Sequence, residues 1–170
     1  MEAVSFNKGW YLIYTNSKQE KKVAGQLDKM KIQHYLPLVK IARQWSDRVK
    51  ILDSPLFPSY LFVYLNQFKD YYLCLETQGA LHFVRFSQKI ARVADSVIGD
   101  LKIIVDAGEH IEVSFNVFQN GETVSITDGP LAGLKCEIIQ YNKREMILVR
   151  IELLQRNLLL ELPVNHLCKL

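Results

Sequence analysis

The sequence predicts an α+β protein: an antiparallel sheet flanked by helices, followed by a small all-β barrel. Short apolar-aromatic runs alternate with amphipathic helical patterns in the first part of the chain, as in an α/β sandwich. Roughly the last 50 residues contain only short alternating runs and turns, as in a small barrel. The 170 residues suffice for one medium domain and a very small one. We expect a first domain over residues 1–106, a linker over 107–119 and the barrel over 120–170.

The first two elements are a strand over residues 9–16 and a helix over residues 17–32. The strand is apolar and aromatic, "GWYLIYTN". Ser17 and Glu20 have the spacing of a capping box, which predicts that the helix begins at Ser17. Helical spacing then predicts one buried stripe, formed by Val23, Leu27 and Met30.

A hairpin follows, with strands over residues 33–45 and 48–65 and a turn at Ser46-Asp47-Arg48. Pro55 and Pro58 predict an irregular entry to the end of the second strand. Residues 60–65 alternate between aromatic and aliphatic side chains, which point to opposite faces of a sheet. Helices of the same chain can bury the aliphatic face, whereas less of the chain remains to cover the aromatic face.

The next elements are a helix over residues 66–79 closed by Gly79, a strand over 81–86 and a short strand over 89–93. A third helix begins at Asp95 or Ser96. Its spacing predicts a buried stripe, formed by Val97, Leu101 and Ile104.

The C-terminal part reads as short strands and turns. Val124 and Ile126 alternate with polar residues, and turns are predicted at residues 128–130 and at Asn142-Lys143. Residues 147–153 and 158–162 alternate with a period of two. The segment also fits a helical template, and its Leu, Glu and Arg content favours a helix. We interpret it as strands because of the sustained alternation.

Composition excludes several classes of protein. No run approaches the roughly 18 apolar residues of a membrane span, and no secretory signal is visible at the N-terminus. Three widely spaced cysteines without a CxxC motif argue against a disulfide framework or a zinc site and fit a reducing cytoplasm. The chain lacks the common nucleotide-binding, hydrolase and metalloprotease motifs, so we expect no enzymatic activity, no cofactor and no metal.

The charge is unevenly distributed. Residues 1–106 contain 15 Lys and Arg against 10 Asp and Glu, a net charge of +5, whereas residues 107–170 contain 6 against 8, a net charge of −2. A basic first part and a mildly acidic second part fit different partners, although a solvated charged surface is the simpler explanation.

Over almost its whole length the chain resembles the NusG/Spt5 family of transcription elongation factors. In order, the matching segments are "GWYLIYT", "KQEKKVAGQL", "HYLPL", "LFPSYLFV" and "GALHFVRF", then "GETVSITDGPLAGLKCEI", which resembles the KOW motif. "RQWSDR", "LFPSY" and "GPLAG" are most similar to specialised bacterial paralogues of the UpxY type, antiterminators of long polysaccharide-biosynthesis operons. General members usually have glycine after "FP", where this chain has Ser59.

The resemblance implies an N-terminal NGN domain that binds RNA polymerase. An aromatic depression on this domain would hold the clamp helices of the polymerase, and a second contact would reach the polymerase lobe. Together they would hold the cleft closed and suppress pausing and termination. The matching clamp-binding residues are Tyr14, Phe57, Tyr60 and Phe62, and the lobe residues are Asp70, Tyr71 and Tyr72.

The resemblance also implies contacts with DNA and with the translation machinery. Specialised paralogues read the non-template DNA strand, through positions that match Gln26, Lys29, Thr77 and Gln78. The basic residues and Trp45 at the predicted hairpin tip could add phosphate contacts. The KOW domain would bind ribosomal protein S10, or Rho in general members, through Leu153, Leu154 and Arg156 at a turn that exposes at least one leucine.

These inferences predict a monomeric cytoplasmic factor without a membrane partner. The alternative is an RNA- or ribosome-binding protein, because KOW barrels also occur in ribosomal proteins. The slight negative charge of the C-terminal part disfavours this alternative, since a phosphate backbone attracts basic surfaces.

Overall fold

The chain divides into two compact units in the computed structural model, Met1–Asp95 and Ser96–Leu170. The structure describes residues 6–86, 89–108, 110–114, 116, 119, 121–127, 129–151, 154–161 and, as backbone, 167–169. The third helix is grouped with the second unit, whereas the sequence predicted a division after residue 106.

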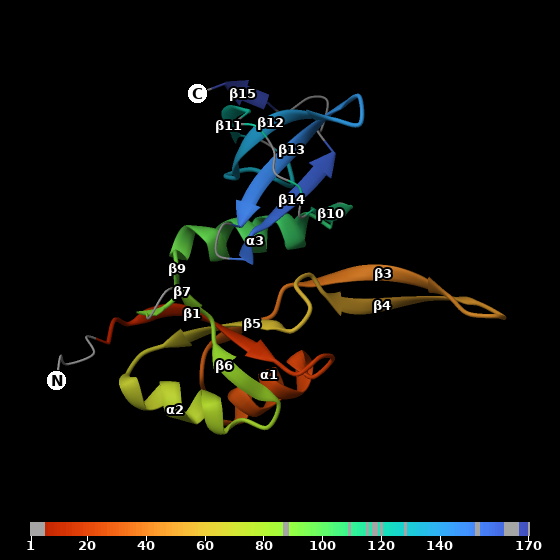
Figure 1. Cartoon of the computed structure of the whole chain (residues 1–170). Coiled ribbons are helices and arrows are strands. Elements are labelled where there is room, and N and C mark those ends of the chain that lie inside the picture. Colours follow the sequence, from red (N-terminus) through yellow and green to blue (C-terminus); the bar gives the residue numbers. More distant parts are fainter. Residues whose placement is uncertain are drawn as a thin grey trace. The chain divides into compact units, whose positions relative to one another are not determined.

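The first unit contains two helices and nine strands among its described residues (Figure 1). The elements are β1 (Gly9–Thr15), α1 (Glu20–Lys29), β2 (His34–Tyr35), β3 (Leu38–Gln44), β4 (Val49–Pro55), β5 (Tyr60–Leu65), α2 (Phe68–Glu76), β6 (Ala80–Phe83), β7 (Arg85–Phe86), β8 (Lys89–Ile90) and β9 (Arg92–Val93).

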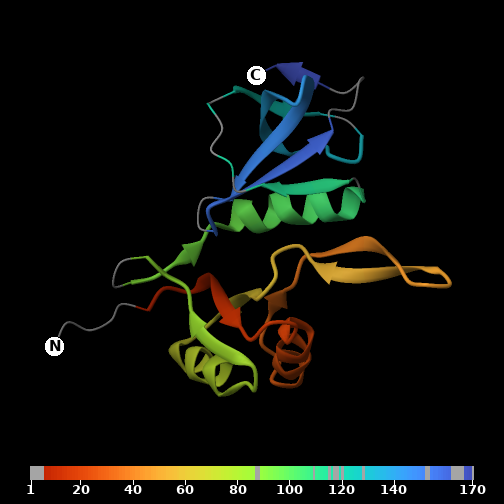
Figure 2. The same ribbon diagram turned by 45° about the vertical axis from the view of Figure 1, so that its right-hand side comes forward.

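The main sheet of the first unit has the strand order β2-β5-β1-β6, and β9 also pairs with β1. The antiparallel register of β1 and β5 aligns Tyr11 with Val63 and Ile13 with Leu61. These aliphatic and aromatic side chains pack with Val23 and Leu27 of α1 in one buried cluster. Figures 1 and 2 show α1 and α2 on the same side of this sheet. The helices therefore cover the odd-numbered face of β5, as the alternation predicted.

The opposite face of the sheet is aromatic. Cross-strand partners on this face are Trp10 with Tyr64, Leu12 with Phe62 and Tyr14 with Tyr60. The rings of Trp10 and Tyr64 meet edge to face, with their centroids 5.3 Å apart. Such pairs stabilise neighbouring strands beyond the area that they bury.

The helix α1 begins later than the sequence predicted. Its N-cap is Gln19 and no side chain caps it, so the predicted capping box of Ser17 and Glu20 is wrong. Lys18 adopts a φ of 62°, so the backbone turns just before the helix and carries Ser17 away from its first turn. The stripe is correct for Val23 and Leu27, but Met30 lies beyond the helix and is 40 % exposed.

The predicted hairpin is confirmed as β3 and β4, but it is a separate two-stranded sheet. The backbone N–H of Trp45 donates to the carbonyl of Arg48 at the turn, 2.8 Å away. The chain leaves β4 at Pro55 and re-enters the main sheet only at Tyr60. In both views the hairpin extends beyond the main sheet of its unit (Figures 1 and 2).

In its described residues, the second unit combines one helix with a six-stranded antiparallel sheet of order β10-β14-β13-β12-β11-β15. The strand β10 lies inside the predicted linker and pairs with β14. The bounds are α3 (Asp95–Ala107), β10 (Ile111–Ser114), β11 (Glu122–Ile126), β12 (Lys135–Tyr141), β13 (Arg144–Ile151), β14 (Arg156–Glu161) and β15 (Leu167–Lys169).

The interpretation of the C-terminal segment as strands is confirmed by β13 and β14, which pair from Met146–Glu161 to Ile151–Arg156. The predicted turn at Asn142-Lys143 is also confirmed, and both residues have positive φ, as tight hairpins require. Two neighbouring positions in β13, Ile147 and Leu148, are both buried, so this strand has apolar contacts on both faces.

Helix α3 buries a stripe that differs by one residue from the prediction. Ile98, Leu101 and Ile104 are buried, whereas Val97 is only half-buried. The helix lies close to the loop before β12. A Cβ atom at Gly133 in this loop would be 3.6 Å from the side chain of Ile103, which is an ordinary van der Waals distance. This contact accounts for part of the apolar surface that α3 buries within the second unit.

Cys74 and Cys136 are free and buried. Burial, and next the nearby negative charge of Asp70, raises the pKa of Cys74 to about 12, so this thiol is uncharged and packs as an apolar group. Among the described residues no helix is long and apolar enough to cross a membrane.

A bidentate ion pair ties the second unit together. Arg150 of β13 donates from Nε to Glu137 Oε1 at 2.7 Å and from Nη2 to Oε2 at 3.1 Å. Glu137 also accepts the backbone N–H of Gly121 at 2.9 Å, just before β11. The hydrogen bond from Arg150 lowers the pKa of Glu137 and outweighs the opposing effect of burial. The pair thus joins three successive strands through charge-assisted hydrogen bonds.

We predict that Glu137→Gln destabilises the second unit by about 1–3 kcal/mol at pH 7, the range for hydrogen bonds to charged groups. Because the folded-state pKa of Glu137 is lowered, its stabilisation is present above the unfolded-state pKa and is lost as the pH falls through the folded-state pKa. Hydrogen exchange of the β12 and β13 amides at several pH values measures this local stability.

Glu161→Gln is the matched control, because it breaks the Arg144–Glu161 ion pair, whose side chains are 74 % and 68 % exposed. An exposed pair contributes little, so exchange should hardly change. Equal effects of the two substitutions would contradict a special role for the Arg150–Glu137 pair.

Candidate functional site

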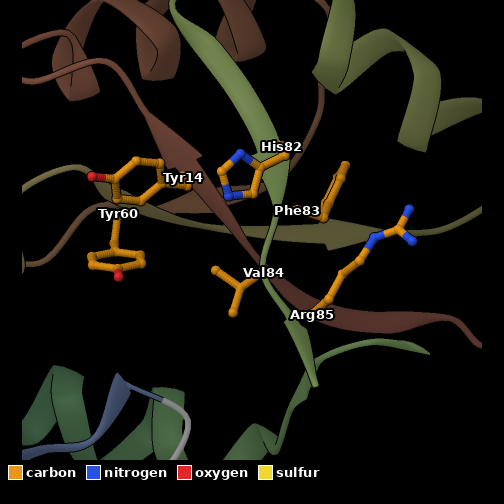
Figure 3. A pocket seen from close by; sticks show the side chains of 6 residues that line it. All are labelled: Tyr14, Tyr60, His82, Phe83, Val84 and Arg85. Carbon is orange, nitrogen blue, oxygen red and sulfur yellow. The ribbon is translucent and has the colours of Figure 1, made fainter. Parts of the chain in front are cut away.

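An open pocket lies at one end of the aromatic face of the first unit. Tyr14 of β1 and Tyr60 of β5 are cross-strand partners, with centroids 5.2 Å apart and planes at 67°. Both side chains are half-buried, so each ring keeps part of its surface accessible. The pocket has a volume of about 610 Å³, and Figure 3 shows the side chains that line it: Tyr14, Tyr60, His82, Phe83, Val84 and Arg85.

Four lining residues, His82, Phe83, Val84 and Arg85, were not among the predicted site residues. The register of β1 and β6 places His82 opposite Tyr14, and their rings lie 5.3 Å apart. Both His82 and Arg85 are exposed. The sequence predicted only that "LHFVRF" forms a strand. It did not show that this strand pairs with β1, which is what brings His82 next to Tyr14. The pocket therefore combines two aromatic rings with groups that can carry positive charge.

Phe57 and Phe62 do not share this accessibility, although they were predicted for the same surface. They are 3 % and 1 % exposed, and their rings pack against each other with centroids 6.3 Å apart. The ring of Tyr35 in β2 lies 6.3 Å from that of Phe62 on its other flank. We therefore assign these two phenylalanines to the support of the aromatic face and not to its accessible surface.

The corner before Tyr60 is fixed by a buried carboxylate. Glu20 is 4 % exposed, and its Oε1 accepts the backbone N–H of Ser59 at 2.6 Å. The carbonyl of Ser59 accepts the N–H of Thr15 at 2.8 Å. Ser59 has a φ of 67°, a left-handed conformation that costs about 1–2 kcal/mol for a residue other than glycine. These two hydrogen bonds hold the strained corner and so determine where Tyr60 points.

Three of the residues predicted to contact DNA, Gln26, Thr77 and Gln78, lie at the junction of α1 and the turn before β6, and Lys29 is the last residue of α1. The side chain of Gln26 donates to the carbonyl of Gln78 at 3.0 Å and accepts its N–H at 3.2 Å. Thr77 is buried, and its hydroxyl donates to the carbonyl of Leu73 at 3.0 Å. The Gln26 amide and Thr77 therefore shape the turn, whereas the side chains of Lys29 and Gln78 are exposed.

Gly79 allows the turn to approach α1 closely. Its φ is 104°, and a Cβ at this position would lie 2.5 Å from Oε1 of Gln19. Helix α2 ends at Glu76 with Thr77 as its C-cap, so Gly79 stands one position beyond the predicted C′ site. The glycine serves the contact between the two elements and not the termination of the helix.

The side chain of Asp70 caps the N-terminus of α2. It is 7 % exposed, and its Oδ2 accepts the N–H groups of Asn66 at 2.9 Å and Gln67 at 3.1 Å, which completes a capping box. Tyr71 stacks on Phe83, with centroids 4.8 Å apart, and only Tyr72 is exposed. Of the three residues predicted to contact the polymerase lobe, only Tyr72 is exposed, and its ring packs edge to face against Phe68 and Tyr71.

The turn before β14 includes Leu154 and Arg156, two of the three residues predicted to contact a ribosomal protein. Leu154 is 6 % exposed, so it does not form the exposed apolar contact expected there, and Leu153 lies outside the described residues. Gln155 has a φ of 49°, which reverses the chain, and Arg156 donates to the carbonyl of Leu154 at 3.0 Å. The tight turn folds Leu154 into the second unit.

No group of three or more His, Cys, Asp or Glu residues suited to a metal ion occurs within the described part of the chain. The features described above are surfaces: an aromatic pocket with a basic rim, a helix–turn junction and an exposed tyrosine. Accessible aromatic rings beside polar and charged groups are typical of surfaces that bind other macromolecules.

The family model for "Transcription termination factor nusG" matches residues 8–102, more than half of the chain, and the chain therefore belongs to the NusG family. Members of this family are transcription termination/antitermination factors without enzymatic activity.

Individual relatives and a solved structure are similar to this chain over most of its length. The NusG protein of Lactococcus lactis subsp. lactis (strain IL1403) is 28% identical over 160 residues, which cover 85% of this chain and 84% of that protein. The NusG protein of Bacillus subtilis (strain 168) is 26% identical, with coverage of 96% and 99%. The structure described as "Domain interaction in Thermotoga maritima NusG" aligns with a TM-score of 0.48 and 20% identity, covering 91% of this chain and 94% of that one.

We predict that Asp70→Ala destabilises the first unit by about 1 kcal/mol, the typical value for loss of a capping side chain. Urea unfolding followed by tryptophan emission measures this unit, because both tryptophans, Trp10 and Trp45, belong to it. Glu76→Ala, an exposed substitution at the other end of α2, is the control and should leave the midpoint nearly unchanged. An unchanged midpoint for Asp70→Ala would show that its carboxylate does not stabilise the helix.

Proposed function

We propose that this chain is a specialised antitermination factor of the UpxY type. In this proposal it binds bacterial RNA polymerase in the cytoplasm, bridges the cleft and suppresses pausing and termination on a long operon, of the kind that encodes polysaccharide biosynthesis. The observation that carries the proposal is the accessible tyrosine pair of a NusG-family chain, Tyr14 and Tyr60, at the mouth of the 610 Å³ pocket.

The clamp helices of the polymerase would insert into this pocket. Tyrosines are efficient anchors, since they bury a large area with only two side-chain torsions to fix. His82 and Arg85 at the rim would pair with acidic or polar groups of the partner. Phe57 and Phe62, buried behind the face, would keep the pocket rigid and so reduce the entropy lost on binding.

A second contact would turn binding into regulation. Tyr72 on α2 would reach the polymerase lobe, next to the stacked Tyr71 and the helix cap formed by Asp70. A protein that touches both sides of a cleft binds the closed state more tightly than the open state. This difference in affinity shifts polymerase away from paused states without any chemical step.

Recognition of a particular operon would use the helix–turn junction. Lys29 would contribute salt-dependent attraction to the phosphates of the non-template strand, and Gln78 would contact its bases. Gln26 and Thr77 would position Gln78 through their backbone contacts. The second unit would bind ribosomal protein S10 near Arg156.

We predict that Tyr14→Ala/Tyr60→Ala weakens binding to core RNA polymerase more than tenfold, because two aromatic anchors are lost together. Titration of the full-length chain with fluorescently labelled polymerase measures the Kd. Tyr64→Ala is the matched control, because Tyr64 lies on the same face of β5 but outside the pocket. It should leave the Kd nearly unchanged.

Tryptophan emission would show that both variants remain folded. If the folded double variant bound polymerase as tightly as the wild type, the pocket would not be the polymerase-binding surface. If Tyr64→Ala weakened binding as much as the double variant, the contact would not be specific to the pocket.

A further inference from the structure

The β3–β4 hairpin presents two chemically different faces. Its register pairs Arg43 with Lys50 and Gln44 with Val49, so side chains alternate between the faces along each strand. The first face carries Arg43, Lys50 and, at the turn, Trp45 and Arg48, with the apolar pair Ile41 and Leu52 further from the turn. The second carries Ala42, Gln44, Val49 and Ile51, with Lys40 opposite Asp53.

The first face, here called the basic face (Arg43, Trp45, Arg48 and Lys50), concentrates positive charge. Like charges directly opposite each other destabilise a pair of strands, yet Arg43 faces Lys50. None of the ion pairs found among the described residues includes Arg43, Arg48 or Lys50. An anionic ligand would relieve this repulsion.

Trp45 adds an exposed aromatic ring to the basic face. Its side chain is 56 % exposed, so part of the indole ring is accessible to a ligand. The hairpin is anchored at its base, where Lys21 of α1 donates to the carbonyl of Asp53 at 2.7 Å. The tip thus projects cations and an indole from a support that is tied to the rest of the first unit.

We propose that the basic face of the β3–β4 hairpin binds single-stranded nucleic acid, with phosphates on Arg43, Arg48 and Lys50 and a base stacked on Trp45. Cations that follow the backbone, combined with an aromatic ring for a base, are the usual means of binding single strands. In a duplex the bases are already stacked, so a lone indole would find no free base. This surface is separate from the junction of Lys29 and Gln78, and it goes beyond the proposed function.

The tryptophans allow a direct test with the full-length chain. Trp10 is 6 % exposed and Trp45 is exposed, and the chain has no other tryptophan. Titration with a single-stranded oligonucleotide should therefore quench the Trp45 emission on binding. Trp45→Phe should bind with nearly the same Kd, measured by fluorescence anisotropy of a labelled oligonucleotide, whereas Trp45→Ala should bind about tenfold more weakly.

Two substitutions that each remove one positive charge, on opposite faces of the hairpin, form a matched pair. Lys50→Gln should weaken binding and reduce the slope of log Kd against log salt by about 0.7, the value for one phosphate contact on a single strand. Lys40→Gln, on the second face of the same hairpin, should leave that slope unchanged because Lys40 faces Asp53. Arg43→Gln/Lys50→Gln should reduce the slope about twice as much as Lys50→Gln alone.

Parallel arms with DNA, RNA and duplex DNA identify the ligand. Quenching of Trp45 by single-stranded DNA or single-stranded RNA supports the proposal. The single strand that binds with the lower Kd is then identified as the ligand. Saturable binding without quenching of Trp45, equal effects of Lys50→Gln and Lys40→Gln, or tighter binding of duplex than of single strands would each overturn it. Lys29→Gln separates this site from the helix–turn junction, because it should not alter the Trp45 quenching.

Discussion

The antiparallel register of β1 and β5 is the constraint on which the first unit depends. It places Tyr11, Ile13, Leu61 and Val63 on one side and Trp10, Tyr14, Tyr60 and Phe62 on the other. The helices then bury the first set, and the second set is left to form the aromatic face. A slip of one residue would exchange the two faces and remove both the core and the pocket. Stability and recognition are thus specified by the same pairing.

Polar side chains inside the first unit have a common task, which is to hold loops that carry candidate contacts. Glu20 holds the corner before Tyr60, Asp70 holds the start of α2, and Gln26 holds the turn at Gln78. All three could be mistaken for surface residues in a sequence, because their types are usually exposed. The hydrogen-bond partners of these three side chains are backbone groups. The side chains can therefore hold each loop whatever residue type occupies the loop position.

The alternation of apolar residues predicted most of the fold. The two faces of β5, the β3–β4 hairpin and the strands β13 and β14 follow directly from period-two patterns. The start of α1 did not, because the Ser17–Glu20 spacing ignores the turn at Lys18 and the demand for a carboxylate at Ser59. The separation of β2 from β3 was also missed, since an apolar run does not reveal where a chain leaves one sheet for another.

The candidate site was partly predictable for the same reason. Tyr14 and Tyr60 line one pocket, and Gln26 is hydrogen-bonded to Gln78. Their roles as contacts for polymerase and DNA, which the family resemblance implies, stay predictions. Local patterns give no measure of burial, so Phe57, Phe62 and Asp70 were assigned to a surface that they support from within. His82 and Arg85 reach the pocket through strand order, which only the folded chain defines.

The left-handed backbone at Ser59 bears on how members of the family can be told apart. Glycine adopts this conformation without strain, and the contact with Glu20 uses the backbone N–H and not the serine hydroxyl. Serine and glycine can therefore form the same bend, but serine does so at a conformational cost that glycine does not have. A difference between serine and glycine at this position therefore concerns the shape and strain of the corner, because the contact with Glu20 uses only the backbone.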